Sequence, residues 1–278
     1  MKPKFLILLA ALLLSGCGPT KDEIYAQASE HFVKREYAKA LPLYEELLVR
    51  DANNPNVYPK LAISYGMTGD FAKCAQYGEE SLQKKQDLFE VYNATGLCYE
   101  KLEKLDQALP IYQEGMKKYP EHSELANRAA MIYFKQKQFK KAGDIFKDLA
   151  EAQPKDIDLN YNAAVSFEKT NQLDQAELYY RRVLEINPKH ANASFGLGSV
   201  FENKSQSEIA QGFYEKALKY NPQHLSALLN LARLQEKQTP KLALKTWEKY
   251  LALAKETKQP ESFIKKAEGR IQSLKGRG

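Results

Sequence analysis

Two adjacent segments of 34 residues share one pattern, and this pattern decides the fold of the chain. Residues 157–190 read IDLNYNAAVSFEKTNQLDQAELYYRRVLEINPKH, and residues 191–224 read ANASFGLGSVFENKSQSEIAQGFYEKALKYNPQH. The eighth position is small in both segments, Ala164 and Gly198, and the twentieth is alanine in both. A fixed period of this length predicts a repeat architecture, in which each unit buries its apolar side against its neighbours.

The same register extends in both directions and divides the chain into seven blocks, which are 21–54, 55–88, 89–122, 123–156, 157–190, 191–224 and 225–258. Position eight is alanine or glycine in every block. Position twenty reads Ala40, Cys74, Ala108, Ala142, Ala176 and Ala210, and Ala243 joins if the seventh block has lost one residue at its Thr239-Pro240 turn. Aromatic residues recur at position twenty-four, in Tyr44, Tyr112, Phe146, Tyr180, Tyr214 and Trp247.

Each recurring residue type has a mechanical reason. Two antiparallel helices approach closely only where their side chains are small, and large rings then fill the space around that contact. Proline ends four blocks, at Pro120, Pro154, Pro188 and Pro222. It cannot continue a helix, because it lacks an N–H and clashes with the preceding turn. The predicted fold is therefore all-α, built from helical hairpins.

This pattern resembles the tetratricopeptide repeat from Lys21 to about Lys258. The resemblance implies a right-handed superhelical solenoid of about seven antiparallel hairpins. The second block departs from the pattern, with Gly78 where a ring is expected, and the seventh has Gln235 at a ring position. Residues 259–278 add an amphipathic segment, with Phe263, Ile264, Ala267, Ile271 and Leu274 on one face. A solenoid exposes the apolar side of its last hairpin, so we expect a capping helix here. The basic character of residues 259–278 leaves open an added role as an arm for anionic lipid or an acidic partner.

The first residues have the features of a secretory signal. Lys2 and Lys4 precede an apolar stretch from Phe5 to Leu14, which is too short to cross a bilayer as an ordinary helix. Leu14-Ser15-Gly16-Cys17 resembles the lipobox of bacterial lipoproteins, which implies a signal peptide over 1–16, lipidation of Cys17 and a short tether over 17–20. The alternative is an ordinary cleaved signal with an incidental cysteine. By the same resemblance, Gly18 after the cysteine favours the outer over the inner membrane.

Charge and cysteine content restrict the remaining possibilities. Removal of Lys2 and Lys4 lowers the formal net charge from +6 to +4, and residues 255–278 account for all of that excess. The chain therefore lacks the extended basic face that nucleic-acid binding requires. Cys74 and Cys98 fall at helix-packing positions, where we expect small buried hydrophobic residues rather than a disulfide, because spacing alone cannot supply the bond geometry.

No pattern of a catalytic or cofactor site is present, so the sequence predicts neither an enzyme nor a bound cofactor. His122, His190 and His224 all occupy position thirty-four of their blocks. Zinc ligands must lie about 2 Å from one ion, whereas neighbouring helices are about 8–10 Å apart. We therefore expect exposed loop histidines and no metal site.

The resemblance places the candidate site in a concave groove lined by the first helix of each hairpin. Position nine is apolar in four consecutive blocks, at Ile63, Leu97, Met131 and Val165. We expect these residues to bind a partner segment together with residues of positions five and six, which are Asn93, Asn127, Asn162, Tyr161, Phe195 and Leu229. Asparagine can both donate to and accept from a peptide backbone. The alternative is that position nine only packs between neighbouring first helices.

A polar rim is predicted beside this groove. Position twelve holds Glu100, Glu168, Glu202 and Glu236, and position thirteen holds Lys101, Lys135, Lys169 and Lys237. We expect the two rows to pair with each other.

The function predicted from these features is a lipid-anchored adaptor that gathers other proteins of the bacterial envelope. By resemblance, suitable settings are pilus pilotins, outer-membrane protein assembly and adaptors of peptidoglycan hydrolases, and the sequence does not choose among them. The alternative is a periplasmic chaperone or carrier that holds polypeptide or a small ligand within the superhelix.

Overall fold

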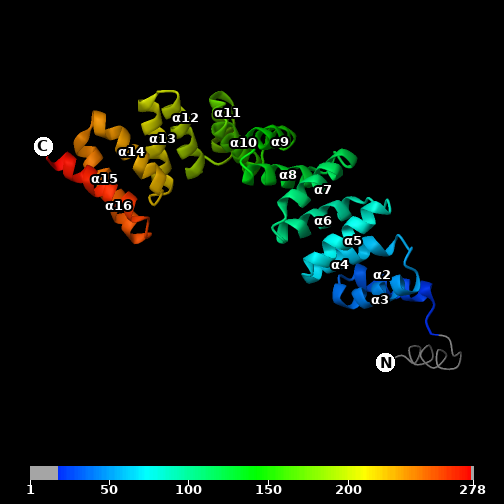
Figure 1. Cartoon of the computed structure of the whole chain (residues 1–278). Coiled ribbons are helices and arrows are strands. Elements are labelled where there is room, and N and C mark those ends of the chain that lie inside the picture. The colour runs from blue at the N-terminus through cyan, green and yellow to red at the C-terminus, as the bar shows by residue number, and fades with distance from the viewer. Residues whose placement is uncertain (1–17, 277–278) are drawn as a thin grey trace, which may run out of the picture. The chain divides into compact units, whose positions relative to one another are not determined.

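The computed structural model describes residues 18–276, so the predicted signal peptide and Cys17 lie outside the described part. The predicted all-α architecture of helical hairpins is confirmed, since residues 18–276 form helices and no strand (Figure 1). In chain order the helices are α2 (Lys21–Val33), α3 (Tyr37–Arg50), α4 (Val57–Thr68), α5 (Phe71–Gln83), α6 (Phe89–Lys101), α7 (Leu105–Lys118), α8 (Ser123–Lys135), α9 (Phe139–Ala152), α10 (Ile157–Lys169), α11 (Leu173–Ile186), α12 (Ala191–Asn203), α13 (Ser207–Tyr220), α14 (Leu225–Gln238), α15 (Pro240–Glu256) and α16 (Glu261–Lys275).

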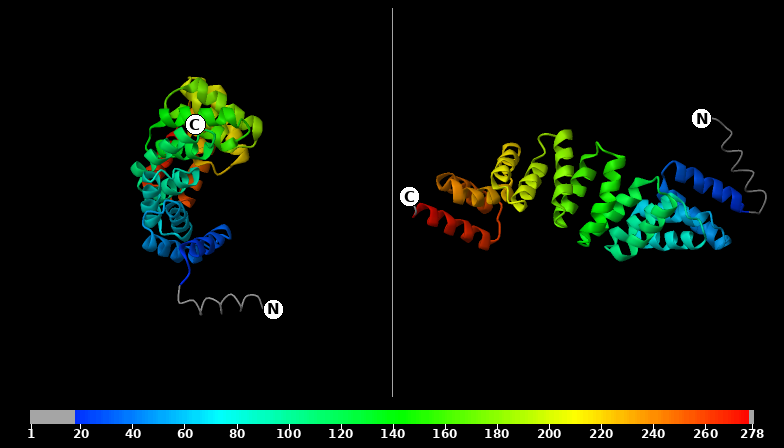
Figure 2. Two further views of the ribbon diagram at one scale, coloured as in Figure 1. Left: turned by 90° about the vertical axis from the view of Figure 1, so that its right-hand side faces the viewer. Right: turned by 90° about the horizontal axis from the view of Figure 1, so that it is seen from above.

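The described chain divides into two units, and the division between Ala129 and Ala130 falls inside α8. In the first unit each helix from α2 to α7 packs against the next one, and in the second unit the helices from α9 to α16 do the same (Figure 2). First helices of neighbouring hairpins also touch, α4 with α6 and α10 with α12. Successive first helices therefore form a shared face within each unit.

The two small-residue columns lie at the closest helix contacts. The alanines of positions eight and twenty have no exposed surface, and the rings of position twenty-four are buried beside them. Gly198 shows why one block needs glycine at position eight. A Cβ atom there would lie 2.5 Å from the ring of Tyr214, far inside van der Waals contact. Helix spacing is thus set by the pairing of a small residue with a large ring.

The turn inside each of the first six hairpins has one residue in the left-handed conformation, always at position fifteen. These residues are Arg35, Gly69, Glu103, Lys137, Asn171 and Ser205, with φ between 59° and 91°. Left-handed backbone costs a residue with a Cβ roughly 1–2 kcal/mol, and glycine avoids this cost. Only Gly69 and Asn171 suit the position, so packing of the helices imposes the turn on the other four.

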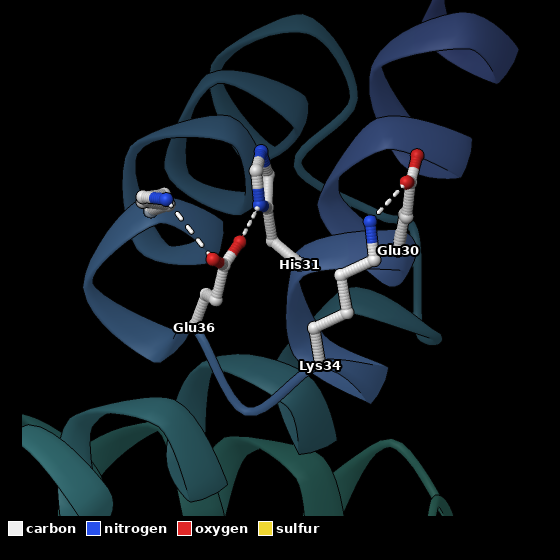
Figure 3. Close-up of polar contacts among 5 residues, drawn as sticks. Glu30, His31, Lys34 and Glu36 are labelled. Atoms are coloured by element: carbon white, nitrogen blue, oxygen red, sulfur yellow. Dashed lines mark hydrogen bonds and ion pairs between the residues drawn. The ribbon is translucent and has the colours of Figure 1, made fainter.

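Polar side chains hold the first of these turns (Figure 3). His31 Nδ1 lies 2.6 Å from Glu36 Oε2, and Lys39 Nζ donates to Glu36 Oε1 at 3.0 Å. These hydrogen bonds from His31 and Lys39 hold the pKa of Glu36 below its usual value. Lys34 donates separately to Glu30 at 2.5 Å. The contacts join the end of α2 to the start of α3.

The expectation that Cys74 and Cys98 are independent buried thiols is wrong. Their sulfur atoms form a disulfide, which ties α5 to α6 and so links the second hairpin to the third. Both cysteines are buried. The reason lies in Gly66 of α4, because a Cβ there would lie 3.1 Å from Cys74 Sγ and 3.2 Å from Cys98 Sγ. The absence of a side chain at Gly66 leaves room for the disulfide. The repeat pattern of the sequence does not predict this contact.

The two ends of the described chain are held by local contacts. Thr20 is the N-cap of α2 and forms a capping box with Glu23. Arg50 donates to the carbonyl oxygen of Pro19 at 2.7 Å. At the other end α16 packs on α15, with Ala267, Ile271 and Leu274 buried.

Within residues 18–276, no helix combines the length and apolar character needed to span a membrane.

Candidate protein-binding face

The four apolar residues of position nine lie on first helices and outside the buried core. Ile63 belongs to α4, Leu97 to α6, Met131 to α8 and Val165 to α10. All four are partly exposed, and Met131 reaches 37%. We call these residues the position-nine stripe. Ile63 and Leu97 belong to the first unit, and Met131 and Val165 to the second. Folding therefore leaves an apolar surface on the first helices of both units.

The three predicted asparagines differ in their accessibility. Asn127 is exposed on α8, whereas Asn93 and Asn162 are partly buried. Asn93 Nδ2 donates to Glu124 Oε1 at 3.1 Å, and its Oδ1 atom is buried with no hydrogen-bond partner. Asn162 Nδ2 lies 3.9 Å from Met131 Sδ, which places this amide beside the stripe. Asn127 and Asn162 are therefore the better placed of the three to meet a peptide backbone.

The residues of position five serve partly as packing residues. The Tyr161 ring lies 5.3 Å from the ring of His190, and the Phe195 ring lies 4.7 Å from that of His224. Leu229 packs against the apolar cluster formed by α14, α15 and α16. Each of the three position-five side chains remains partly exposed. They form the edge of the first-helix face and help to hold the next hairpin.

The expectation of exposed loop histidines is wrong for His190 and His224. Each caps a first helix, with its Nδ1 atom accepting from the backbone N–H of Ala193 at 3.0 Å or of Ala227 at 3.2 Å. Both rings are half-buried, and this desolvation lowers the pKa of each imidazole. Histidine is an uncommon N-cap, so the register alone gave no signal for this role. His122 instead stacks on Phe89, with ring centroids 3.9 Å apart.

The glutamates of position twelve bind the rings of position twenty-four rather than the lysines of position thirteen. Tyr112 donates to Glu100 at 2.6 Å, Tyr180 to Glu168 at 2.6 Å and Tyr214 to Glu202 at 2.8 Å. Trp247 Nε1 donates to Glu236 at 2.8 Å. Burial, together with the carboxylate acceptor, raises the pKa of Tyr112, Tyr180 and Tyr214, so these hydroxyls stay protonated donors.

Each of these carboxylates also binds a side chain from the element that follows its hairpin. Ser199 donates to Glu168 at 2.5 Å, Arg128 to Glu100 at 3.4 Å, and Arg233 forms an ion pair with Glu202. Arg270 of α16 lies 3.4 Å from Glu236. The glutamate column thus joins neighbouring hairpins. The sequence contains a signal for this column. Phe146, a ring of position twenty-four without a hydrogen-bond donor, belongs to the block that has Phe134 instead of glutamate at position twelve.

The expected pairing between positions twelve and thirteen is therefore wrong. Lys101, Lys135, Lys169 and Lys237 are exposed, and none forms an ion pair within the described residues. The first two blocks have apolar residues at this position, Val33 and Met67, which are 80% and 62% exposed. Nothing in the repeat pattern distinguishes Val33 and Met67 as binding residues. Position thirteen is thus apolar in the first two blocks and basic in four of the other five.

A metal site was not predicted, and in the described part of the chain no three His, Cys, Asp or Glu side chains gather closely enough to hold a metal ion. The polar groups of the first-helix face instead bind one another in fixed hydrogen bonds. Such a surface suits recognition of another polypeptide through apolar contacts and backbone hydrogen bonds.

Comparisons with known proteins agree with this architecture. Residues 101–166 match one tetratricopeptide-repeat family profile, and residues 157–190 and 191–224 each match a second. The chain therefore contains tetratricopeptide repeats. No curated protein matches the sequence.

Among solved structures, one similar protein is YrrB, a TPR protein with an unusual peptide-binding site. Its sequence is 19% identical and its TM-score is 0.60, and the matched region covers 66% of this chain and 95% of the YrrB chain. The C-terminal part of a TPR repeat-containing protein from Cytophaga hutchinsonii is 16% identical, with a TM-score of 0.66, covering 89% and 99%. MamA is 19% identical, with a TM-score of 0.56, covering 59% and 97%. At these identities the likeness shows the shared fold.

Proposed function

We propose that this protein is a lipid-anchored scaffold of the bacterial cell envelope, which binds an extended segment of a partner protein along its first helices. Tetratricopeptide repeats are protein–protein interaction modules, so a protein partner is the general expectation for this chain. The observation that supports the site most directly is the exposure of the position-nine stripe. Its four apolar side chains stay in contact with solvent, although the small residues one position earlier are buried.

Within each unit the stripe residues suit an extended segment, Ile63 with Leu97 in the first and Met131 with Val165 in the second. First helices of adjacent hairpins are about 8–10 Å apart when they have ordinary helix spacing. An extended peptide rises about 3.3 Å per residue, so about every third side chain would meet one stripe residue. Asn127 and Asn162 lie beside Met131 in the block pattern and supply donors and acceptors for the peptide backbone. A peptide-binding site occurs in the similarly folded YrrB, which supports this class of ligand.

Two features support the envelope location. The lipobox-like Leu14-Ser15-Gly16-Cys17 precedes the first hairpin by only three residues, Gly18 to Thr20. The Cys74–Cys98 disulfide is of a kind that persists in the periplasm and other oxidising compartments and is rare in the cytosol. Two or more acyl chains on Cys17 would anchor the protein stably, with the outer membrane favoured. The partners proposed are other envelope proteins, in settings such as pilus assembly, outer-membrane protein assembly or control of peptidoglycan hydrolases.

The test combines photo-crosslinking with matched charge variants in cells. A photoreactive amino acid at 131 or 165 should crosslink one set of envelope proteins. The same probe at 178 or 209, on the second helices α11 and α13, should not. Met131→Glu/Val165→Glu should abolish capture. Leu178→Glu/Ile209→Glu should retain it, because these two residues lie on second helices. They are a matched control, since Leu178 and Ile209 are 43% and 47% exposed and Met131 is 37% exposed.

Three controls make the result decisive. Circular dichroism must show unchanged helicity in Met131→Glu/Val165→Glu, because unfolding would assign position nine to the core. A palmitate analogue should label the wild-type chain and not Cys17→Ser, and label on that variant would refute the anchor. Equal capture by both double variants would refute the first-helix site.

A further inference from the structure

A cavity lies away from the position-nine stripe, at the last helices of the second unit. It measures about 760 Å³ and is lined by Thr239, Pro240, Lys241, Leu242, Leu244, Leu274 and Lys275. The start of α15 and the end of α16 form its walls. Thr239 alone separates α14 from α15, so this hairpin lacks the longer turn of the others. The volume lies within the range of about 300–1,000 Å³ that is typical of small-ligand sites.

The lining combines an apolar wall with positive charge at its rim. Three leucines form the wall, and one of them, Leu242, is 43% exposed. Lys275 Nζ lies 3.0 Å from Glu248 Oε1, so this lysine already has an anionic partner. Lys241 is exposed and forms no ion pair within the described residues. The cavity therefore offers apolar contact and one available cation close together.

The chemistry of the wall distinguishes between classes of ligand. An extended peptide backbone inside the cavity would need a polar partner for each buried N–H and C=O group, because an unpaired one costs free energy. An alkyl chain has no such groups, and its burial against leucine side chains is favourable. The available lysine favours an anionic head group on that chain.

We propose that this cavity binds a fatty carboxylate, with the alkyl chain against Leu242, Leu244 and Leu274 and the carboxylate on Lys241. The site is separate from the partner-binding face proposed above, and each can fail without the other. It would give the protein a second ligand, a free fatty acid of the kind that membrane lipids release.

Isothermal titration of the chain from Gly18 to Gly278, which contains every described helix, tests the site. The probe is dodecanoate, used below the concentration at which it forms micelles. One binding site is expected, and uncharged dodecyl maltoside should bind at least about tenfold more weakly. Equal binding of the two amphiphiles would overturn the assignment of the head group to Lys241.

Matched variants assign the site to the cavity. Leu242→Glu should abolish dodecanoate binding, whereas Ile209→Glu, at a similarly exposed leucine-sized residue of α13, should not. Lys241→Glu should weaken binding at least about tenfold, whereas Lys266→Glu on the exposed surface of α16 should have no effect. Unchanged binding in Leu242→Glu would overturn the proposal. So would sedimentation data showing a dimer that Leu242→Glu dissociates, because a second copy would then occupy the cavity.

Discussion

The hydroxyl of Tyr180 donates a 2.6 Å hydrogen bond to Oε2 of Glu168 in the partner helix of the same hairpin. Ser199 of the next hairpin donates to the other oxygen of this carboxylate at 2.5 Å. One charged group therefore satisfies a buried ring hydroxyl and links two repeats. The arrangement recurs at Glu100 and Glu202, so these contacts contribute to stability in both units.

Removal of the Tyr180 hydroxyl should destabilise the fold. Hydrogen bonds to charged groups contribute roughly 1.5–3 kcal/mol, so we expect Tyr180→Phe to lower the free energy of unfolding by about this amount. Urea unfolding followed by circular dichroism measures the change. Tyr220→Phe, at a half-buried tyrosine whose hydroxyl has no described hydrogen bond, should change stability by less than about 0.5 kcal/mol. A similar loss in both variants would show that the Glu168 contact contributes nothing specific.

The reverse substitution tests the same rule in the fourth block. Phe146 is buried, and position twelve of its block is Phe134 instead of glutamate. Phe146→Tyr would bury a hydroxyl with no carboxylate to accept from it, which costs roughly 1–3 kcal/mol. Adding Phe134→Glu should recover part of this loss in urea unfolding. A double variant no more stable than Phe146→Tyr alone would contradict the rule.

The left-handed turns predict a stabilising substitution. Lys137 has a φ of 59°, and glycine removes the steric cost of this conformation. Because glycine also gains entropy in the unfolded chain, we expect Lys137→Gly to raise the free energy of unfolding by only about 0.5–1 kcal/mol. Lys147→Gly, at an exposed site in the middle of α9, should instead lower it by about 1 kcal/mol. A loss of stability in Lys137→Gly would show that its aliphatic stem, and not the backbone, decides the position.

The two histidine caps make stability depend on pH. Burial lowers the folded-state pKa of His190 and His224 below about 6.5, the value expected in the unfolded chain. Below that value the unfolded chain binds more protons than the folded one, so stability falls as pH decreases. Above it both states are neutral, and the contribution is fully present. His190→Asn/His224→Asn supplies caps that do not titrate, so its stability should change less than that of the wild-type protein between pH 7.5 and 5.5. Parallel curves would refute the role of these caps.

Reduction of the Cys74–Cys98 disulfide should weaken the first unit. The cysteines are 24 residues apart, and closing a loop of this size contributes about 3.5 kcal/mol in the chain-entropy account. Hydrogen exchange with and without reductant should show faster exchange in α4 to α6. Helices α12 to α15 should exchange at an unchanged rate. Faster exchange in α12 to α15 as well would show that the two units unfold together.

The fold was predictable because it depends on columns of small and large residues that recur at one period. Ala164, Ala176 and Tyr180 show this within a single block, since size alone specifies which helices approach and where a ring fits. The site was less predictable. The exposure of Met131 could be expected, but the hydrogen bond from Asn93 Nδ2 to Glu124 of the next hairpin could not.

Other features depended on contacts that no local pattern encodes. The disulfide packs tightly against Gly66 of a third helix, where a side chain would crowd both sulfur atoms. The histidine caps use a residue type that is uncommon at that position, and the left-handed turns occur at Arg35 and Glu103 without a glycine. The glutamate–ring pairs were detectable in principle, because donors at position twenty-four coincide with Glu100 and Glu202 at position twelve.

The left-handed residue at position fifteen has a consequence for how such a chain can evolve. Arginine, glutamate, lysine and serine adopt nearly the same φ at this position. Since the helices determine the turn, mutation can replace its surface residue freely at a small and roughly constant cost in stability. A gene encoding this protein can therefore accumulate changes at the hairpin tips while the spacing between neighbouring helices stays the same.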